Sequence, residues 1–218
     1  MEDIEYKGYI IKIEQDELAF EQSPRDWCNI GTMVSWHRRC TIGDYSVGTR
    51  NSGSYTPVGR KEGQPVFRDA QDLVDFIHEH TKKKDIVWAP VYLYEHGGQT
   101  IRTYPFGDPW DSGQVGFIWV STEDIRKEFK VKRVTQKLRE KVHKILVQEV
   151  ETYDQWLRGD IYYYIISDPN SFEDQEDSCG GFYGYNYCLQ EAKDVIDHLA
   201  EKRDEKLWEK VSVEVVGD

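Results

Sequence analysis

Apolar residues recur along the chain with two different spacings, which separate predicted strands from predicted helices. Apolar side chains three and four residues apart predict helices over 69–80, 135–157 and 189–208. A shorter helix through Phe129 begins at a capping box formed by Ser121 and Asp124. Runs rich in β-branched and aromatic residues predict strands over 8–14, 32–38, 86–94, 100–104, 114–120, 160–167 and 181–187.

The order of these elements is strands, helix, strands, two helices, strands, helix, and a Val-rich tail after residue 208 is a candidate edge strand. This order lacks the strict alternation of a doubly wound parallel sheet. It predicts an α+β fold with a mostly antiparallel sheet and three to four helices. We expect one compact domain over 1–218, with a loop-rich insertion at 41–65 where Gly, Pro, Ser and Asn interrupt the pattern.

Composition is that of a folded chain. The 218 residues are 39% hydrophobic and 13% aromatic, which is enough to bury a core and argues against wholesale disorder. No apolar run approaches the ~18 residues that a membrane-spanning helix needs. The N-terminus is acidic and lacks the features of a secretory signal. We therefore expect a soluble protein of a reducing compartment, the cytoplasm.

The net charge of −12 is concentrated near the C-terminus. Residues 161–218 contain 14 acidic and 5 basic side chains. Such a field disfavours binding to nucleic acid or an anionic membrane and favours basic partners. An acidic surface that is only solvated is the alternative.

Carboxylates form a row on the last predicted helix. At 1.5 Å rise per residue, steps of three and four residues place them roughly 5 Å apart along one line. A basic nucleic-acid-binding groove could accept such a row in place of a phosphate backbone, although a solvated helix face has the same pattern. The row and its extension in the preceding loop are Asp194, Asp197, Glu201, Asp204 and Glu205, with Glu173, Asp174, Glu176 and Asp177.

A basic stretch runs from Arg126 to Lys144, with nine basic and two acidic residues. Phosphate contact, pairing with an acidic partner and a solvated helix face are all compatible with it. A helix–turn–helix that reads DNA over 122–157 fits the local pattern, but the total charge argues against it. We leave the role of the stretch open.

Several loop residues could form a polar site if the fold brings them together. A loop acid near a histidine can act as an acid–base pair, and the candidates are His37, His96, Asp108 and Asp111. Asp26, Asp111 and Asp177 each precede glycines ahead of a predicted strand, which also suits simple turns. Trp110, between Pro109 and Asp111, is either a buried anchor of its loop or an exposed contact residue for a partner.

The four cysteines, Cys28, Cys40, Cys179 and Cys188, match no zinc-binding spacing. His37 and Cys40 with Cys28 could supply three ligands, but free thiols are the ordinary outcome in a reducing compartment. Gly-x-Ser-x-Gly, HExxH and Walker-type motifs are missing from the sequence. We therefore predict no metal and no cofactor, and the sequence favours a non-enzymatic function.

Three stretches of the chain resemble a family of uncharacterised proteins from phage and mobile-element genomes. The family has no assigned activity or catalytic residues, so the resemblance implies only a context in which small proteins often inhibit host defence. The stretches are Pro24–Trp27 through Gly31–Val34 with His37–Arg39, Pro105–Phe106 through Pro109–Ile118, and Leu157–Asp160 with Asp177–Cys179 and Gly181–Gly184.

These observations lead to one main hypothesis and two others. The main hypothesis is a non-enzymatic inhibitor that binds a host defence or nucleic-acid-processing protein through an acidic, nucleic-acid-mimicking surface, in the cytoplasm of the host. It places Trp110 and Asp111 among the partner-binding residues and predicts no direct DNA binding. The first alternative is a small enzyme or ligand-binding protein with a site in the Gly-rich loops around Asp26, Asp111 and Asp177. The second is an assembly protein that self-associates through Trp and Tyr surfaces.

Overall fold

The computed structural model describes residues 3–37, 39–47, 63–169 and 176–215, with side chains through Arg203. This part of the chain contains four helices and nine strands, and the predicted α+β class is confirmed. We expected one domain, whereas the chain divides into two compact units. Unit 1 combines Met1–Glu21 with Gly159–Asp218, and unit 2 is the contiguous segment Gln22–Arg158. Unit 2 is therefore an insertion between the two parts of unit 1.

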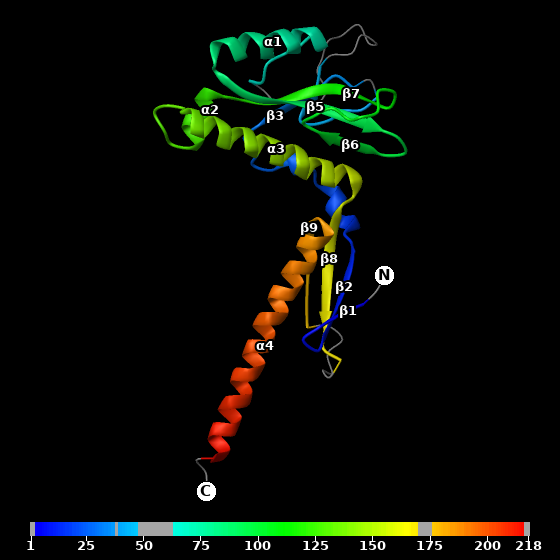
Figure 1. Cartoon of the computed structure of the whole chain (residues 1–218), viewed down its shortest axis with the longest axis vertical. Coiled ribbons are helices and arrows are strands. Elements are labelled where there is room, and N and C mark those ends of the chain that lie inside the picture. Colours follow the sequence, from blue (N-terminus) through cyan, green and yellow to red (C-terminus); the bar gives the residue numbers. More distant parts are fainter. Residues whose placement is uncertain (1–2, 38, 48–62, 170–175, 216–218) are drawn as a thin grey trace. The chain divides into compact units, whose positions relative to one another are not determined.

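Unit 2 is a five-stranded sheet with helices on both faces (Figure 1). Neighbouring strands run antiparallel, except for β3 and β4. Helix α1 (Ala70–Lys83) covers one face, while α2 (Thr122–Glu128) and α3 (Gln136–Arg158) cover the other. In spatial order the strands are β4 (Tyr45–Ser46), β3 (Thr32–Ser35), β7 (Ser112–Ser121), β5 (Ile86–Glu95) and β6 (Gln99–Arg102).

Side chains of β5 alternate between the two faces of the sheet, so this strand contributes to both apolar cores of unit 2. Val87 and Leu93 belong to the cluster that packs against α3, whereas Ile86 and Trp88 belong to the cluster under α1. Successive side chains of a strand point to opposite faces, so one apolar run serves two helical layers. Gly116 on β7 allows the close approach of β3, because a Cβ there would lie 2.2 Å from the Val34 carbonyl oxygen.

Capping side chains and a glycine fix the ends of the helices in unit 2. The predicted capping box is present, since the Ser121 hydroxyl accepts a hydrogen bond from the Asp124 N–H at 3.0 Å. Asp69 caps α1 in the same way, accepting from the Asp72 N–H at 3.0 Å. Gly159, with φ of +68°, ends α3 as predicted. None of the described helices is long and apolar enough to cross a membrane.

A buried arginine ties the N-terminal segment of unit 2 to its core. Arg25, in the short 3-10 helix η2 (Pro24–Asp26), is 6% exposed. Its guanidinium donates two hydrogen bonds to Asp44, at 3.0 and 2.9 Å, and one to Glu149 on α3 at 3.0 Å. Glu149 also accepts the Ile30 N–H at 2.8 Å. The network joins three segments that are distant in sequence.

Unit 1 is a four-stranded antiparallel sheet with one long helix, α4 (Tyr185–Val215), on one face (Figure 1). Cys188, Ala192 and Ile196 of α4 are fully buried against apolar strand residues that include Ile11 and Ile166. The 3-10 helix η1 (Glu17–Glu21) follows β2. The strand order is β1 (Ile4–Tyr6), β2 (Tyr9–Gln15), β8 (Ile161–Ser167) and β9 (Asp177–Tyr183).

Three sequence predictions near the C-terminus differ from the structure. The strand predicted over 181–187 is β9, at 177–183, because its pairing with β8 begins at Asp177. Gly184, with φ of +94°, ends the extended run, so α4 begins at Tyr185 rather than at residue 189. The edge strand predicted for the Val-rich tail is wrong, since α4 continues through Val215.

Of the insertion predicted at 41–65, residues 48–62 lie outside the described residues and Tyr45–Ser46 form β4.

Candidate functional site

Unit 2 has a polar pocket beside one end of its sheet. We call it the His37 pocket, and its volume is about 260 Å³. The segment after β3, the end of β5 and the turn that leads into β7 supply its walls. Its lining residues are His37, Arg39, Leu93, Glu95, Trp110, Asp111, Ser112, Gly113 and Val115.

Glu95 holds one side of the His37 pocket together. His37 places Nε2 3.6 Å from Glu95 Oε2, and Arg39 donates a short hydrogen bond to the same oxygen. Gln99 donates to the other Glu95 oxygen at 3.3 Å and contacts Cys40 Sγ at 3.2 Å. The hydrogen bond from Gln99 and the charges of Arg39 and His37 lower the pKa of Glu95. Glu95 is therefore an anion that orients three neighbouring side chains.

The other side is a hydrogen-bonded turn that contains Trp110. The Asp108 carboxylate accepts the N–H groups of Trp110 and Asp111, at 2.8 and 3.2 Å, and these bonds lower its pKa. Asp111 lies 3.1 Å from His96 Nδ1. The Trp110 side chain is nevertheless 92% exposed. Trp110 is therefore not a buried anchor of its loop, and the backbone bonds of Asp108 hold the turn without the indole.

The structure thus brings together the loop residues that the sequence singled out. His37 and Asp111 line the same pocket, and His96 joins them through Asp111. Asp26 does not line this pocket, and Asp177 belongs to unit 1.

The polar groups of the His37 pocket contact one another. His37 Nδ1 lies 3.0 Å from Cys40 Sγ, so both ring nitrogens already have neighbours, and the thiol is outside the pocket lining. The pocket offers Asp111, Glu95 and Arg39 for polar contacts and the Trp110 indole at its edge. A polar side chain or a small polar ligand suits this arrangement.

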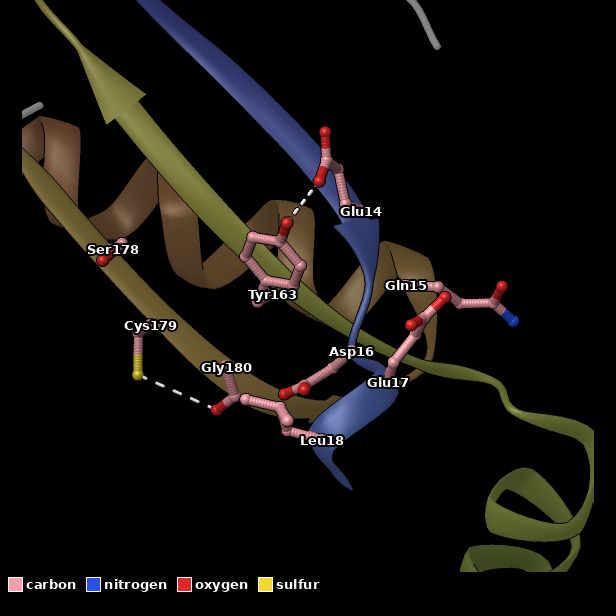
Figure 2. Close-up of a pocket in the computed structure, with 9 residues that line it drawn as sticks. All are labelled: Glu14, Gln15, Asp16, Glu17, Leu18, Tyr163, Ser178, Cys179 and Gly180. Atoms are coloured by element: carbon pink, nitrogen blue, oxygen red, sulfur yellow. Dashed lines mark hydrogen bonds between the residues drawn. The ribbon is translucent and has the colours of Figure 1, made fainter. Parts of the chain in front are cut away.

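Unit 1 has a larger pocket that sequence reasoning missed (Figure 2). We call it the Glu14 pocket, and its volume is about 630 Å³. The end of β2 and the start of η1 form one wall, and β8 and β9 form the others. Its lining residues are Glu14, Gln15, Asp16, Glu17, Leu18, Tyr163, Ser178, Cys179 and Gly180.

Hydrogen bonds fix the carboxylates of the Glu14 pocket. Tyr163 donates a short hydrogen bond to Glu14, and this bond raises the pKa of the tyrosine (Figure 2). Asp16 accepts the Gly181 N–H at 2.9 Å. A Cβ on Gly180 would lie 2.6 Å from an Asp16 oxygen, so the Asp16 carboxylate would have to shift if another residue replaced this glycine. Three carboxylates in four residues, at the end of a predicted strand and just after it, were the signal available in the sequence.

The acidic row predicted on the last helix is present in part. Asp194 and Glu201 are exposed, while Asp197 pairs with Lys7 at 3.0 Å, and this contact lowers the pKa of Asp197. Lys7 therefore interrupts the row with a positive charge. Glu176 is exposed. Glu173 and Asp174 and the side chains of Asp204 and Glu205 lie outside the described part of the structure.

Acidic charge is segregated between the two units. Unit 1 contains 22 acidic and 7 basic residues, a net −15, whereas unit 2 contains 18 acidic and 21 basic residues, a net +3. Unit 1 combines the N-terminal strands with the acidic C-terminal segment. A count of charge over consecutive segments of the sequence therefore does not show how acidic this unit is. The acidic character of the chain thus belongs to unit 1 alone.

Of the candidate metal ligands, His37 and Cys40 lie together, 3.0 Å apart. Cys28 and Cys179 are exposed, Cys40 is half-buried and Cys188 is buried. Among the described residues, no three His, Cys, Asp or Glu side chains are grouped so as to hold a metal ion. Comparisons with protein-family models, curated proteins and solved structures find no match to this chain.

Proposed function

We propose that the chain is a non-enzymatic binding protein whose acidic unit 1 engages a basic, nucleic-acid-binding protein and competes with its nucleic acid. The carrying observation is the segregation of charge, −15 in unit 1 against +3 in unit 2. A field of this size steers a basic partner toward one unit and weakens as salt rises. The phage and mobile-element context implied by the sequence resemblance makes host defence proteins the first partner class to test.

Exposed carboxylates of unit 1 supply the contacts in this proposal. Asp194 and Glu201 on α4, and Glu176 before β9, are exposed. Glu17, at the edge of the Glu14 pocket, is also exposed. Carboxylates with water around them can pair with a partner's Lys and Arg at small desolvation cost.

Trp110 supplies an apolar contact from unit 2. Indoles that are held in place and exposed are typical of binding hot spots, because they lose little conformational freedom on docking. The Asp108 turn fixes the backbone of Trp110 before any partner binds. Unit 2 therefore adds an aromatic contact residue of its own, separate from the carboxylates of unit 1.

The test is affinity capture from bacterial lysate with matched charge variants. The tagged chain should retain a nucleic-acid-binding protein at low salt, and added duplex DNA should release it. Asp194→Asn/Glu201→Gln/Glu176→Gln should weaken binding of that protein about tenfold or more, since each lost pair contributes up to about 1 kcal/mol. The control, Asp75→Asn/Glu79→Gln/Glu151→Gln, removes three exposed carboxylates from unit 2 outside residues 122–144 and should leave affinity unchanged. Equal effects of the two triple variants, or retention that DNA does not reverse, contradict the proposal.

A further inference from the structure

The basic stretch that the sequence analysis left open forms an exposed surface on unit 2. It comprises the end of α2, the turn that follows and the first half of α3. Lys127 pairs with Glu123 at 2.9 Å, and Lys141 lies over the Phe129 ring at 5.2 Å. Six other cations are exposed and have no ion-pair partner among the described residues; we call them the α2–α3 basic surface, and they are Arg126, Lys130, Lys132, Arg133, Lys137 and Lys144.

A groove beside α3 extends this basic surface. Its volume is about 460 Å³, and Gln136, Arg139, Glu140, His143 and Lys144 line it from the helix, with Glu140 the one carboxylate among them. Ile86–Trp88 line it from β5, at an edge where β6 pairs only with Tyr92–Glu95. Arg139 donates to the Ile86 carbonyl at 3.0 Å and to the Lys84 carbonyl, so its guanidinium is held in place. The groove therefore extends the basic surface, and hydrogen bonds to two carbonyl groups hold one of its cations, Arg139, in place.

From this surface we infer a second binding site, on which unit 2 contacts the phosphate backbone of nucleic acid. Protein–nucleic acid interfaces are polar and strongly positive, whereas protein–protein interfaces have an apolar centre. The large hydrophobic side chains that are exposed include Trp110, Tyr104 and Leu18, but none of those in the described part of the chain lies between residues 122 and 158. Within the described chain, the six unpaired cations have no exposed large hydrophobic side chain among them, which matches a phosphate backbone better than an acidic protein.

The site lies on the unit of the chain that carries a net positive charge, because the excess acid belongs to unit 1. Unit 2 by itself is net +3, and residues 126–144 are net +7, from nine basic and two acidic residues. Backbone contacts of this kind are independent of base sequence and release counterions. The inference goes beyond the proposed function, in which unit 1 contacts protein, and it replaces the sequence-based expectation that the chain does not bind DNA directly.

Fluorescence anisotropy of the full chain with a labelled 20-base-pair DNA duplex tests the inference. With about four phosphates contacted, affinity should fall about 100-fold between 50 and 200 mM salt. Lys132→Glu/Lys137→Glu should weaken binding at least about tenfold and reduce the log–log salt slope by about 2. The control, Lys12→Glu/Lys82→Glu, makes the same charge change at two exposed lysines elsewhere and should change neither.

Three outcomes would overturn the inference. The first is absence of duplex binding at 50 mM salt, and the second is an equal effect of the two double variants. The third is displacement of the duplex by poly-glutamate at the same concentration of charge, which would assign the surface to an acidic protein. Because the carboxylate variants of unit 1 are not used here, failure of this test leaves the proposed function standing, and the reverse also holds.

Discussion

Arg25 is a single side chain on which the N-terminal segment of unit 2 depends. It lies between two carboxylates whose side chains are only 13% (Asp44) and 11% (Glu149) exposed. Its Nη2 also donates to the Gly31 carbonyl at 2.6 Å. Gly31 leaves room for this arrangement, because a Cβ there would lie 2.9 Å from a Glu149 oxygen and 2.5 Å from Leu146.

Replacement of Arg25 should therefore destabilise unit 2 strongly. Arg25→Met leaves two buried carboxylates without their cation, and we expect a loss of about 3–5 kcal/mol in the free energy of unfolding. Arg25→Lys keeps the charge but not the two-pronged contact with Asp44, so its loss should be smaller. Urea unfolding followed by tryptophan fluorescence measures both. A loss below about 1 kcal/mol for Arg25→Met would show that the network contributes little.

The apolar core between α4 and its sheet contains two titratable side chains, Cys188 and Tyr164. Burial raises the pKa of the Cys188 thiol to about 11. Burial, together with the Asp177 charge, raises the pKa of Tyr164 to about 12. Both groups are buried in the same apolar cluster and are neutral at physiological pH. The folded state therefore resists ionisation that the unfolded chain undergoes freely.

This packing predicts a loss of stability in alkali. A group whose pKa is raised on folding stabilises the native state below its unfolded pKa, and that contribution disappears as pH rises toward the folded value. For Cys188 the loss should begin near pH 9 and reach on the order of 2 kcal/mol by pH 11. Unfolding free energies measured from pH 8 to 11 test this. Cys188→Ala should reduce the slope between pH 9 and 10 and leave the smaller contribution of Tyr164, and an identical slope in both proteins would contradict the assignment.

The sequence predicts elements better than it predicts sites, for a physical reason. Helices α1 and α3 show a 3.6-residue apolar period that their packing preserves, and both were predicted within a few residues. The Glu14 pocket instead depends on the pairing of β2 with β8, which joins Glu14 to Tyr163 across 149 positions. Periodicity does not encode such pairing. The start of α4 was misplaced because aromatic residues after Gly184 resemble a strand until the register of β9 is known.

For the whole molecule, the main architectural fact is that unit 2 interrupts unit 1 between two adjacent strands. Strands β2 and β8 pair antiparallel up to Gln15 and Tyr162. Just beyond this pair, the Asp16 N–H donates to the Ile161 carbonyl at 2.8 Å, and Gln15 donates to the Gly159 carbonyl at 2.7 Å. The chain therefore leaves unit 1 and returns to it at neighbouring points. Insertions with closely spaced ends are typical of segments that fold independently.

A fragment of residues 22–158 should consequently fold alone. It contains two complete apolar clusters and the Arg25 network, so we expect native helix content by circular dichroism and one cooperative unfolding transition. Without the −15 charge of unit 1, its affinity for the 20-base-pair duplex should exceed that of the full chain at 50 mM salt, while capture of the basic partner should be lost. A folded fragment that binds the duplex more weakly than the full chain would place the nucleic-acid contact outside unit 2. A fragment with broad, non-cooperative unfolding would instead show that unit 2 needs unit 1 to complete its fold.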